Sequence, residues 1–129
     1  MKRTLISVSP EAVGAYSVKA GTSTIASFAF NKCEKLTDIT VPSTVKNVGN
    51  GAFNACYSLT NVSLPESITA IAPTAFSNCY SLQSINIPES VTVIGSQAFE
   101  RCYGLTSFIL TNGIRDIEHS AFFRLRHLN

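Results

Sequence analysis

The chain is poor in several residues on which whole classes of protein depend. Its 129 residues include no tryptophan, one methionine and two histidines, and only 14% are charged. The net charge of +2 is too small to favour nucleic acid or an anionic membrane surface. No apolar run reaches the roughly 18 residues that a membrane span needs. We therefore expect no nucleic-acid partner and no membrane insertion. Because 45% of the residues are apolar, we expect one folded domain over residues 1–129.

Signatures of catalysis and of cofactor binding are also missing. The sequence has no glycine-rich phosphate loop, zinc-protease motif or nucleophile elbow. His119 has only Glu118 beside it, and neighbouring residues tend to face apart, so both His119 and His127 are interpreted as solvated surface residues. We expect no enzyme activity, no catalytic residues and no cofactor. The opening residues 1–10 contain only a brief apolar stretch, so no signal peptide is expected in this chain.

What the sequence has instead is an internal repeat of constant length, without insertions. Several columns recur in the same phase, which coincidence cannot produce. Leucine recurs at Leu36, Leu59, Leu82, Leu105 and Leu128, which defines a 23-residue period. An Ala-Phe pair recurs with its phenylalanine at Phe30, Phe53, Phe76, Phe99 and Phe122. Cysteine recurs at Cys33, Cys56, Cys79 and Cys102.

One repeat unit predicts one turn of a solenoid. Ile39 and Val41 alternate with polar residues, which is typical of a half-buried strand, and Pro42 ends that strand. The segment 51–56 places apolar residues at offsets that suit a tight helical turn. A single unit cannot bury these residues alone, but stacked units can.

The sequence therefore predicts an α/β solenoid. Its parallel β-sheet lies on one face, with short helical turns and extended segments on the other. Residues 1–12 are expected to form an N-terminal cap. Five units are expected at residues 13–35, 36–58, 59–81, 82–104 and 105–127.

Residues 82–102, LQSINIPESVTVIGSQAFERC, resemble the BspA-type leucine-rich repeat. The resemblance extends over about residues 5–129 and implies a leucine-rich repeat solenoid with a binding role. Proteins similar to this are mostly surface or secreted proteins of host-associated bacteria and of some protists, and several bind host matrix proteins. The resemblance thus implies a location at the cell surface or outside the cell. It implies no catalytic residue, because the family motif contains none.

The four cysteines fit three interpretations: metal ligands, disulfides or core residues. Metal sites need ligands clustered at short spacings, whereas successive cysteines here are one full repeat unit apart, so no metal site is expected. Stacked neighbours would lie close enough for a disulfide. However, Leu125 takes the same column in the last unit, which favours a buried apolar position and reduced thiols.

Two surfaces are candidates for ligand binding. On the exposed strand face, the candidate residues are Thr37, Thr60, Gln83, Asn61 and Asn86. These side chains are uncharged and could form a platform for hydrogen bonding or simply a solvated sheet surface. The second candidate surface is the column Tyr57, Tyr80 and Tyr103, each directly after a cysteine. If the cysteine points inward, the rings should point outward and stack roughly 5 Å apart. They could equally pack only on one another.

The leading functional hypothesis is a surface-exposed, non-catalytic module that binds a protein or glycan, with host extracellular matrix among the candidate ligands. The alternative is a structural spacer that displays other domains and binds nothing. The C-terminal end raises a further expectation. Phe122, Phe123, Leu125 and Leu128 would lie on an imperfectly capped end beside an unpaired strand edge. Either further chain or a second copy, forming a homo-oligomer, would cover it.

Overall fold

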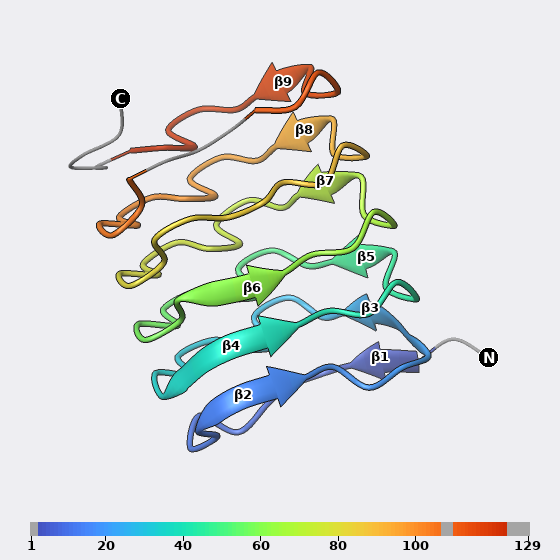
Figure 1. Cartoon of the computed structure of the whole chain (residues 1–129), viewed down its shortest axis with the longest axis vertical. Helices are drawn as coiled ribbons and strands as arrows, with labels where there is room; N and C mark the ends of the chain where they lie inside the picture. Colours follow the sequence, from blue (N-terminus) through green and yellow to red (C-terminus); the bar gives the residue numbers. More distant parts are fainter. Residues whose placement is uncertain (1–2, 107–109, 124–129) are drawn as a thin grey trace.

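The computed structural model describes residues 3–106 and 110–123, and every structural statement below concerns these residues. The chain winds into a stack of similar coils that rises from the N-terminus to the C-terminus (Figure 1). We number coils 1 to 5 by the repeat units, from residues 13–35 to residues 105–127. Each complete coil passes along a front face, returns along a back face, and closes through a turn edge that leads to the next front segment.

Parallel strands line both faces. On the front, β2 (Gly14–Ser17), β4 (Leu36–Thr40) and β6 (Asn61–Ser63) form one sheet. On the back, β1 (Arg3–Leu5), β3 (Thr22–Ile25) and β5 (Asn47–Val48) form a second sheet. Farther up the back, β7 (Ala70–Ile71), β8 (Val93–Ile94) and β9 (Asp116–Ile117) form a third. The prediction of a parallel sheet on one face is confirmed, and the extended segments of the other face prove to contain short paired strands.

The core lies between the two faces and is built from the repeated columns. The rings of Phe30, Phe53, Phe76, Phe99 and Phe122 stack in series, with successive centroids 5.2, 5.0, 5.4 and 5.5 Å apart. The first four of these rings are almost completely buried. Tyr16 meets Phe30 edge to face at 84°, so its ring ends the parallel stack at the N-terminal side.

The predicted helical turns are wrong, because no described residue is helical. In an α-helix each amide would bond within its own segment, four residues back. Here alternate amides of the turn edge donate to the next coil instead. The Phe53 amide donates to the Ala75 carbonyl at 2.9 Å, whereas the Asn54 amide donates within its coil to Gly51 at 2.9 Å. The turn edge is therefore a run of tight turns that is hydrogen-bonded to the turn edge of the next coil.

Left-handed backbone conformations explain why these turns do not wind into a helix. Each described turn edge has one residue near φ +60° at its start, and the column reads Phe28, Gly51, Thr74, Gln97 and Ser120. A second such residue follows four positions later at Lys32, Ala55, Asn78 and Arg101. A left-handed residue interrupts a right-handed helix. Only Gly51 in these two columns is a glycine, so no residue type in the sequence signals the conformation.

The strand expected in residues 82–88 is not formed. Ile85 and Ile87 are buried as the alternation predicts, but no ladder pairs this segment to β6. In the fifth unit the expected strand falls partly on residues 107–109, which lie outside the described residues. Leu110, which lies three repeat units after the buried Val41, is 47% exposed.

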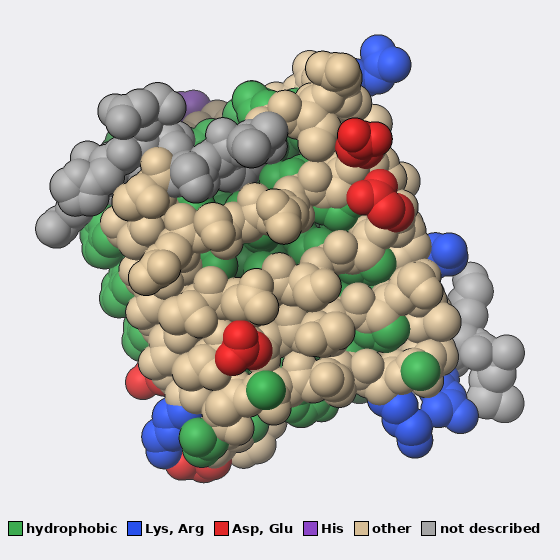
Figure 2. All heavy atoms as spheres, viewed as in Figure 1, with side chains coloured by type: hydrophobic (Ala, Val, Ile, Leu, Met, Phe, Trp, Pro, Cys, Tyr) green, Lys and Arg blue, Asp and Glu red, His purple; other side chains and the backbone are tan. Residues whose placement is uncertain are grey.

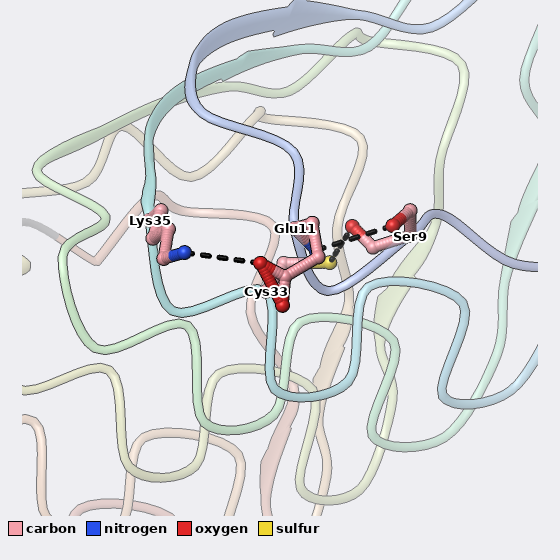
Figure 3. A network of polar contacts seen from close by, with 4 residues as sticks. All are labelled: Ser9, Glu11, Cys33 and Lys35. Atoms are coloured by element: carbon pink, nitrogen blue, oxygen red, sulfur yellow. Dashed lines mark hydrogen bonds and ion pairs between the residues drawn. The ribbon is translucent and has the colours of Figure 1, made fainter.

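The N-terminal segment continues the solenoid by a partial coil. β1 pairs in parallel with β3, and Val8 is buried in the core. Figure 3 shows how the segment is tied to coil 1: the Cys33 thiol approaches the Ser9 carbonyl at 3.7 Å, and Lys35 pairs with Glu11 at 3.1 Å. This ion pair is largely exposed and contributes little stability. The hydrogen bonds and the burial of Val8 hold the segment in place.

Candidate binding surface

The three tyrosines form a continuous ladder on the turn edge. The ring centroids of Tyr57 and Tyr80 are 4.7 Å apart, and those of Tyr80 and Tyr103 are 5.3 Å apart. The rings deviate from parallel by only 12° and 16°. The predicted spacing is confirmed. Tyr80 is 39% exposed, while Tyr57 and Tyr103 are partly buried.

The position of this ladder follows from the cysteine column beside it. Cys56, Cys79 and Cys102 are completely buried, so the residue after each one emerges on the opposite side of the chain. The stacking also decides what the ladder offers to a partner. Both faces of the Tyr80 ring are covered by neighbouring rings, so this ring presents its edge and its hydroxyl group. Such a ladder suits hydrogen bonding and edge contacts rather than stacking of a flat ligand on a ring face.

The candidate residues of the front face lie where the sequence predicts. Thr60, Asn61, Gln83 and Asn86 are exposed, and Thr37 is partly buried. The Thr37 hydroxyl donates to the Asp38 carboxylate at 2.8 Å. Figure 2 shows this side of the molecule, where most of the surface is neither hydrophobic nor charged. Tyr57 precedes Thr60 by three residues and Tyr80 precedes Gln83 by three, so the tyrosine ladder adjoins the front face along the chain.

A short row of asparagine amides on the turn edge is a feature that sequence reasoning missed. The Asn54 amide nitrogen donates to the Asn31 side-chain oxygen at 2.9 Å, and Asn78 donates to the Asn54 oxygen at 3.2 Å. Asn31 and Asn54 are one period apart, which was an available signal. The third member is displaced, because Ser77 occupies that column and Asn78 follows it.

The cysteines are buried free thiols, as the sequence predicts. Each thiol of the upper three donates to the carbonyl of a phenylalanine: Cys56 to Phe30 at 3.2 Å, Cys79 to Phe53 at 3.2 Å and Cys102 to Phe76 at 3.0 Å. Burial raises the pKa of Cys56 and of Cys102 to about 12. The thiolate is the nucleophilic form of cysteine, so these protonated thiols react slowly in the folded protein.

Metal-ligating residues do not gather in the described part of the chain. It contains no group of three or more histidine, cysteine or acidic residues placed to hold a metal ion. None of its segments is a helix long and apolar enough to cross a membrane. His119 is exposed, whereas His127 lies outside the described residues. At the C-terminal end Phe123 is 47% exposed and Phe122 is partly buried; Leu125 and Leu128 lie outside the described residues.

A stack of parallel coils with a 23-residue period and a leucine column defines a leucine-rich repeat solenoid. The sequence matches the BspA type leucine rich repeat region, in six copies, over residues 15–129. The chain therefore belongs to the BspA-type leucine-rich repeat family.

Solved structures agree with this assignment. The leucine-rich repeat protein of T. pallidum is 32% identical with a TM-score of 0.82, and the match covers 84% of this chain and 53% of that one. A leucine-rich cell surface protein of Faecalibacterium prausnitzii is 29% identical with a TM-score of 0.82, and the match covers 91% of this chain and 35% of that one. The pneumococcal vaccine antigen PcpA shares the fold, with a TM-score of 0.83 at 22% identity, and the match covers 97% of this chain and 32% of that one. No curated protein matches. The chain thus spans about a third to a half of the length of these proteins.

Proposed function

We propose that this chain is a non-catalytic recognition module that binds a protein or glycan through the tyrosine ladder and the adjoining front face. The ladder carries the proposal. Three phenol rings, set about 5 Å apart by the coil spacing, lie beside a polar front face whose candidate residues are uncharged and on which Asp38 supplies a carboxylate. Tyrosine combines a rigid apolar ring with a hydroxyl group, and it is enriched where binding energy concentrates.

The neighbouring polar face supports the same function. Its threonine, asparagine and glutamine side chains can donate and accept hydrogen bonds without the desolvation cost of a full charge. A partner with regularly spaced hydroxyl or carbonyl groups, such as a glycan or an extended protein segment, would match this surface. A related protein is named as a cell surface protein, and we propose a surface or secreted location for this one.

An array of immobilised extracellular matrix proteins and glycans tests this function. The wild-type chain is compared with the triple variant Tyr57→Ser, Tyr80→Ser and Tyr103→Ser. A control variant, Lys46→Ser with Arg115→Ser, changes exposed residues on the back face. We expect the wild type and the control to be captured by the same array component, and the tyrosine variant to be lost from it. Equal capture of all three proteins would contradict the role of the ladder. Capture on no component would favour a spacer.

A further inference from the structure

The back face of the solenoid is interrupted between coils 2 and 3. β5 and β7 belong to different sheets and are not paired (Figure 1). In the column of Thr69, the amides of Lys46, Thr92 and Arg115 each donate to the coil before them, at 2.9, 2.9 and 2.8 Å. The Thr69 amide makes no such backbone bond within the described residues.

A second amide at this back-face junction between coils 2 and 3, hereafter the back seam, also lacks the bond that its column makes elsewhere. In the column of Ala72, the amides of Gly49, Gly95 and Glu118 donate to the preceding coil at 2.8, 2.8 and 2.9 Å. The Ala72 amide makes no backbone bond to coil 2 among the described residues. An apolar cavity of about 10 Å³ lies at this seam, and Val48, Leu64 and Ala72 are among its lining residues. The lost bonds and the cavity both show that the coils are less closely joined here.

The front face is interrupted one coil later, between coils 3 and 4. The amides of Val18 and Val41 donate to the following coil at 2.9 and 3.0 Å, whereas Leu64, in the same column, has no backbone acceptor in the described chain. At the other end of the strand segment, Thr60 and Thr106 donate to the preceding coil at 2.9 and 3.3 Å. In that column the Gln83 amide makes no backbone bond to coil 3 within the described residues. β6 is accordingly the last strand of the front sheet.

The turn edge remains joined at both of these junctions. Between coils 2 and 3, the Phe53 amide donates to the Ala75 carbonyl at 2.9 Å. Between coils 3 and 4, the Phe76 amide donates to the Ala98 carbonyl at 2.8 Å. The stacked phenylalanine rings also continue through both. Coil 3 is thus bonded to coil 2 along the front, to coil 4 along the back, and to both along the turn edge.

We infer that coil 3, residues 59–81, is a hinge within the solenoid. The staggered breaks remove backbone pairing from one face at each junction, so coil 3 can tilt about the contacts that remain, which are the turn edge and, at the loop between the faces, the bonds from the Ser67 hydroxyl to Val45 and from the Ser90 hydroxyl to Ile68. The hinge joins a lower block, residues 3–58, to an upper block, residues 82–106 and 110–123. Hinge movements of this kind require a few residues that absorb the change while the blocks on either side stay packed.

The front seam crosses the candidate binding surface. Thr37, Thr60 and Asn61 lie before the seam, and Gln83 and Asn86 lie after it. Tilting of coil 3 therefore changes the angle between two halves of the polar face. The hinge is carried by hydrogen bonds and packing, so it does not depend on whether the tyrosine ladder binds a ligand.

Residual dipolar couplings of the wild-type chain test the hinge without any ligand. Amide couplings from the two blocks are fitted separately. A hinge predicts alignment tensors of different magnitude, because the blocks reorient relative to each other. Amide exchange gives a local measure: Thr69 and Ala72 should exchange at least about tenfold faster than Lys46 and Gly49. One tensor that reproduces both blocks within error would overturn the inference.

A disulfide staple tests where the hinge lies. Asn47→Cys with Ala70→Cys joins the open back seam, in the column where strand pairing is lost. The matched control, Ala70→Cys with Val93→Cys, joins residues that are already paired in β7 and β8. The first staple should reduce the difference between the two tensors, because it removes movement at the back seam and leaves only the front seam, whereas the control should leave the difference unchanged. A difference as large in the first staple as in the wild type would place the motion elsewhere and overturn the assignment to coil 3.

Discussion

Tyr57 and Tyr80 lie with their ring planes 12° from parallel and their centroids 4.7 Å apart, although one full repeat unit separates them in the chain. This pair shows how the period acts: whatever stands in one column of the repeat is brought into contact with its copy in the next coil. The same relationship stacks the phenylalanines inside and places the cysteines in a buried column. The core and the candidate binding surface are therefore both built from stacked columns of identical residues.

The buried cysteines predict a clear difference in thiol reactivity. The native protein should react very slowly with a thiol reagent, because all four sulfur atoms are shielded. After denaturation without a reductant, we expect four free thiols per chain by titration. A count of zero or two would show disulfides and contradict the structure. Rapid reaction in the native state would contradict the burial.

The raised thiol pKa values predict a loss of stability at alkaline pH. The thiols of Cys56 and Cys102 have a pKa of about 12 when folded, against an ordinary value of 9.0. Their stabilising contribution is therefore complete below pH 9 and declines as the pH rises from 9 towards 12, since only the unfolded chain ionises there.

Urea unfolding at pH 9 and pH 10 measures this effect. Each of these thiols should account for about 1 kcal/mol of lost unfolding free energy over that interval. The variant Cys102→Ala should lose correspondingly less than the wild type between the same two pH values. Identical pH dependence in the two proteins would show that the thiol at this position ionises as easily folded as unfolded.

Gly49 predicts a steric limit on how closely coils approach. A Cβ atom added at Gly49 would clash with the Ser27 backbone nitrogen, and backbone cannot move aside cheaply. We expect Gly49→Ala to lower the unfolding free energy by about 1–3 kcal/mol. The control Lys46→Ala, at an exposed position of the same coil, should stay within about 0.5 kcal/mol of the wild type. Chemical denaturation compares the three, and equal stability of Gly49→Ala and wild type would refute the close approach.

The sequence predicts the stack because its core columns repeat without insertion. Leucine, phenylalanine and cysteine each recur once per repeat unit, and a chain that buries all of them must bring successive units into register. The alternation around Ile39 likewise predicts the strand that the structure contains. The spacing of the tyrosine rings follows from the same period, whereas their role in binding stays a prediction.

The turn edge shows what the repeat could not reveal. Phe53 and Cys56 have a spacing that suits a helix, but the Phe53 amide bonds to the next coil rather than within its own turn. The left-handed residues that permit this arrangement are mostly not glycine, so no residue type marks them. The seams at Thr69 and Leu64 are a further case. They depend on small differences between neighbouring coils, which a pattern shared by all coils does not carry.

Replacing the tyrosine hydroxyls and then the rings tests the proposed recognition role most directly. The triple Tyr→Phe variant at positions 57, 80 and 103 keeps the stack and removes the hydroxyl groups; the triple Tyr→Ser variant removes both. Capture on the array of matrix proteins and glycans and the melting temperature are measured for each. We expect Tyr→Ser to abolish capture with little change in melting temperature. We also expect Tyr→Phe to weaken capture and to melt within roughly 3 °C of the wild type. A sharp fall in the melting temperature of Tyr→Ser, with capture per folded molecule unchanged in both variants, would show that the ladder only stabilises the stack.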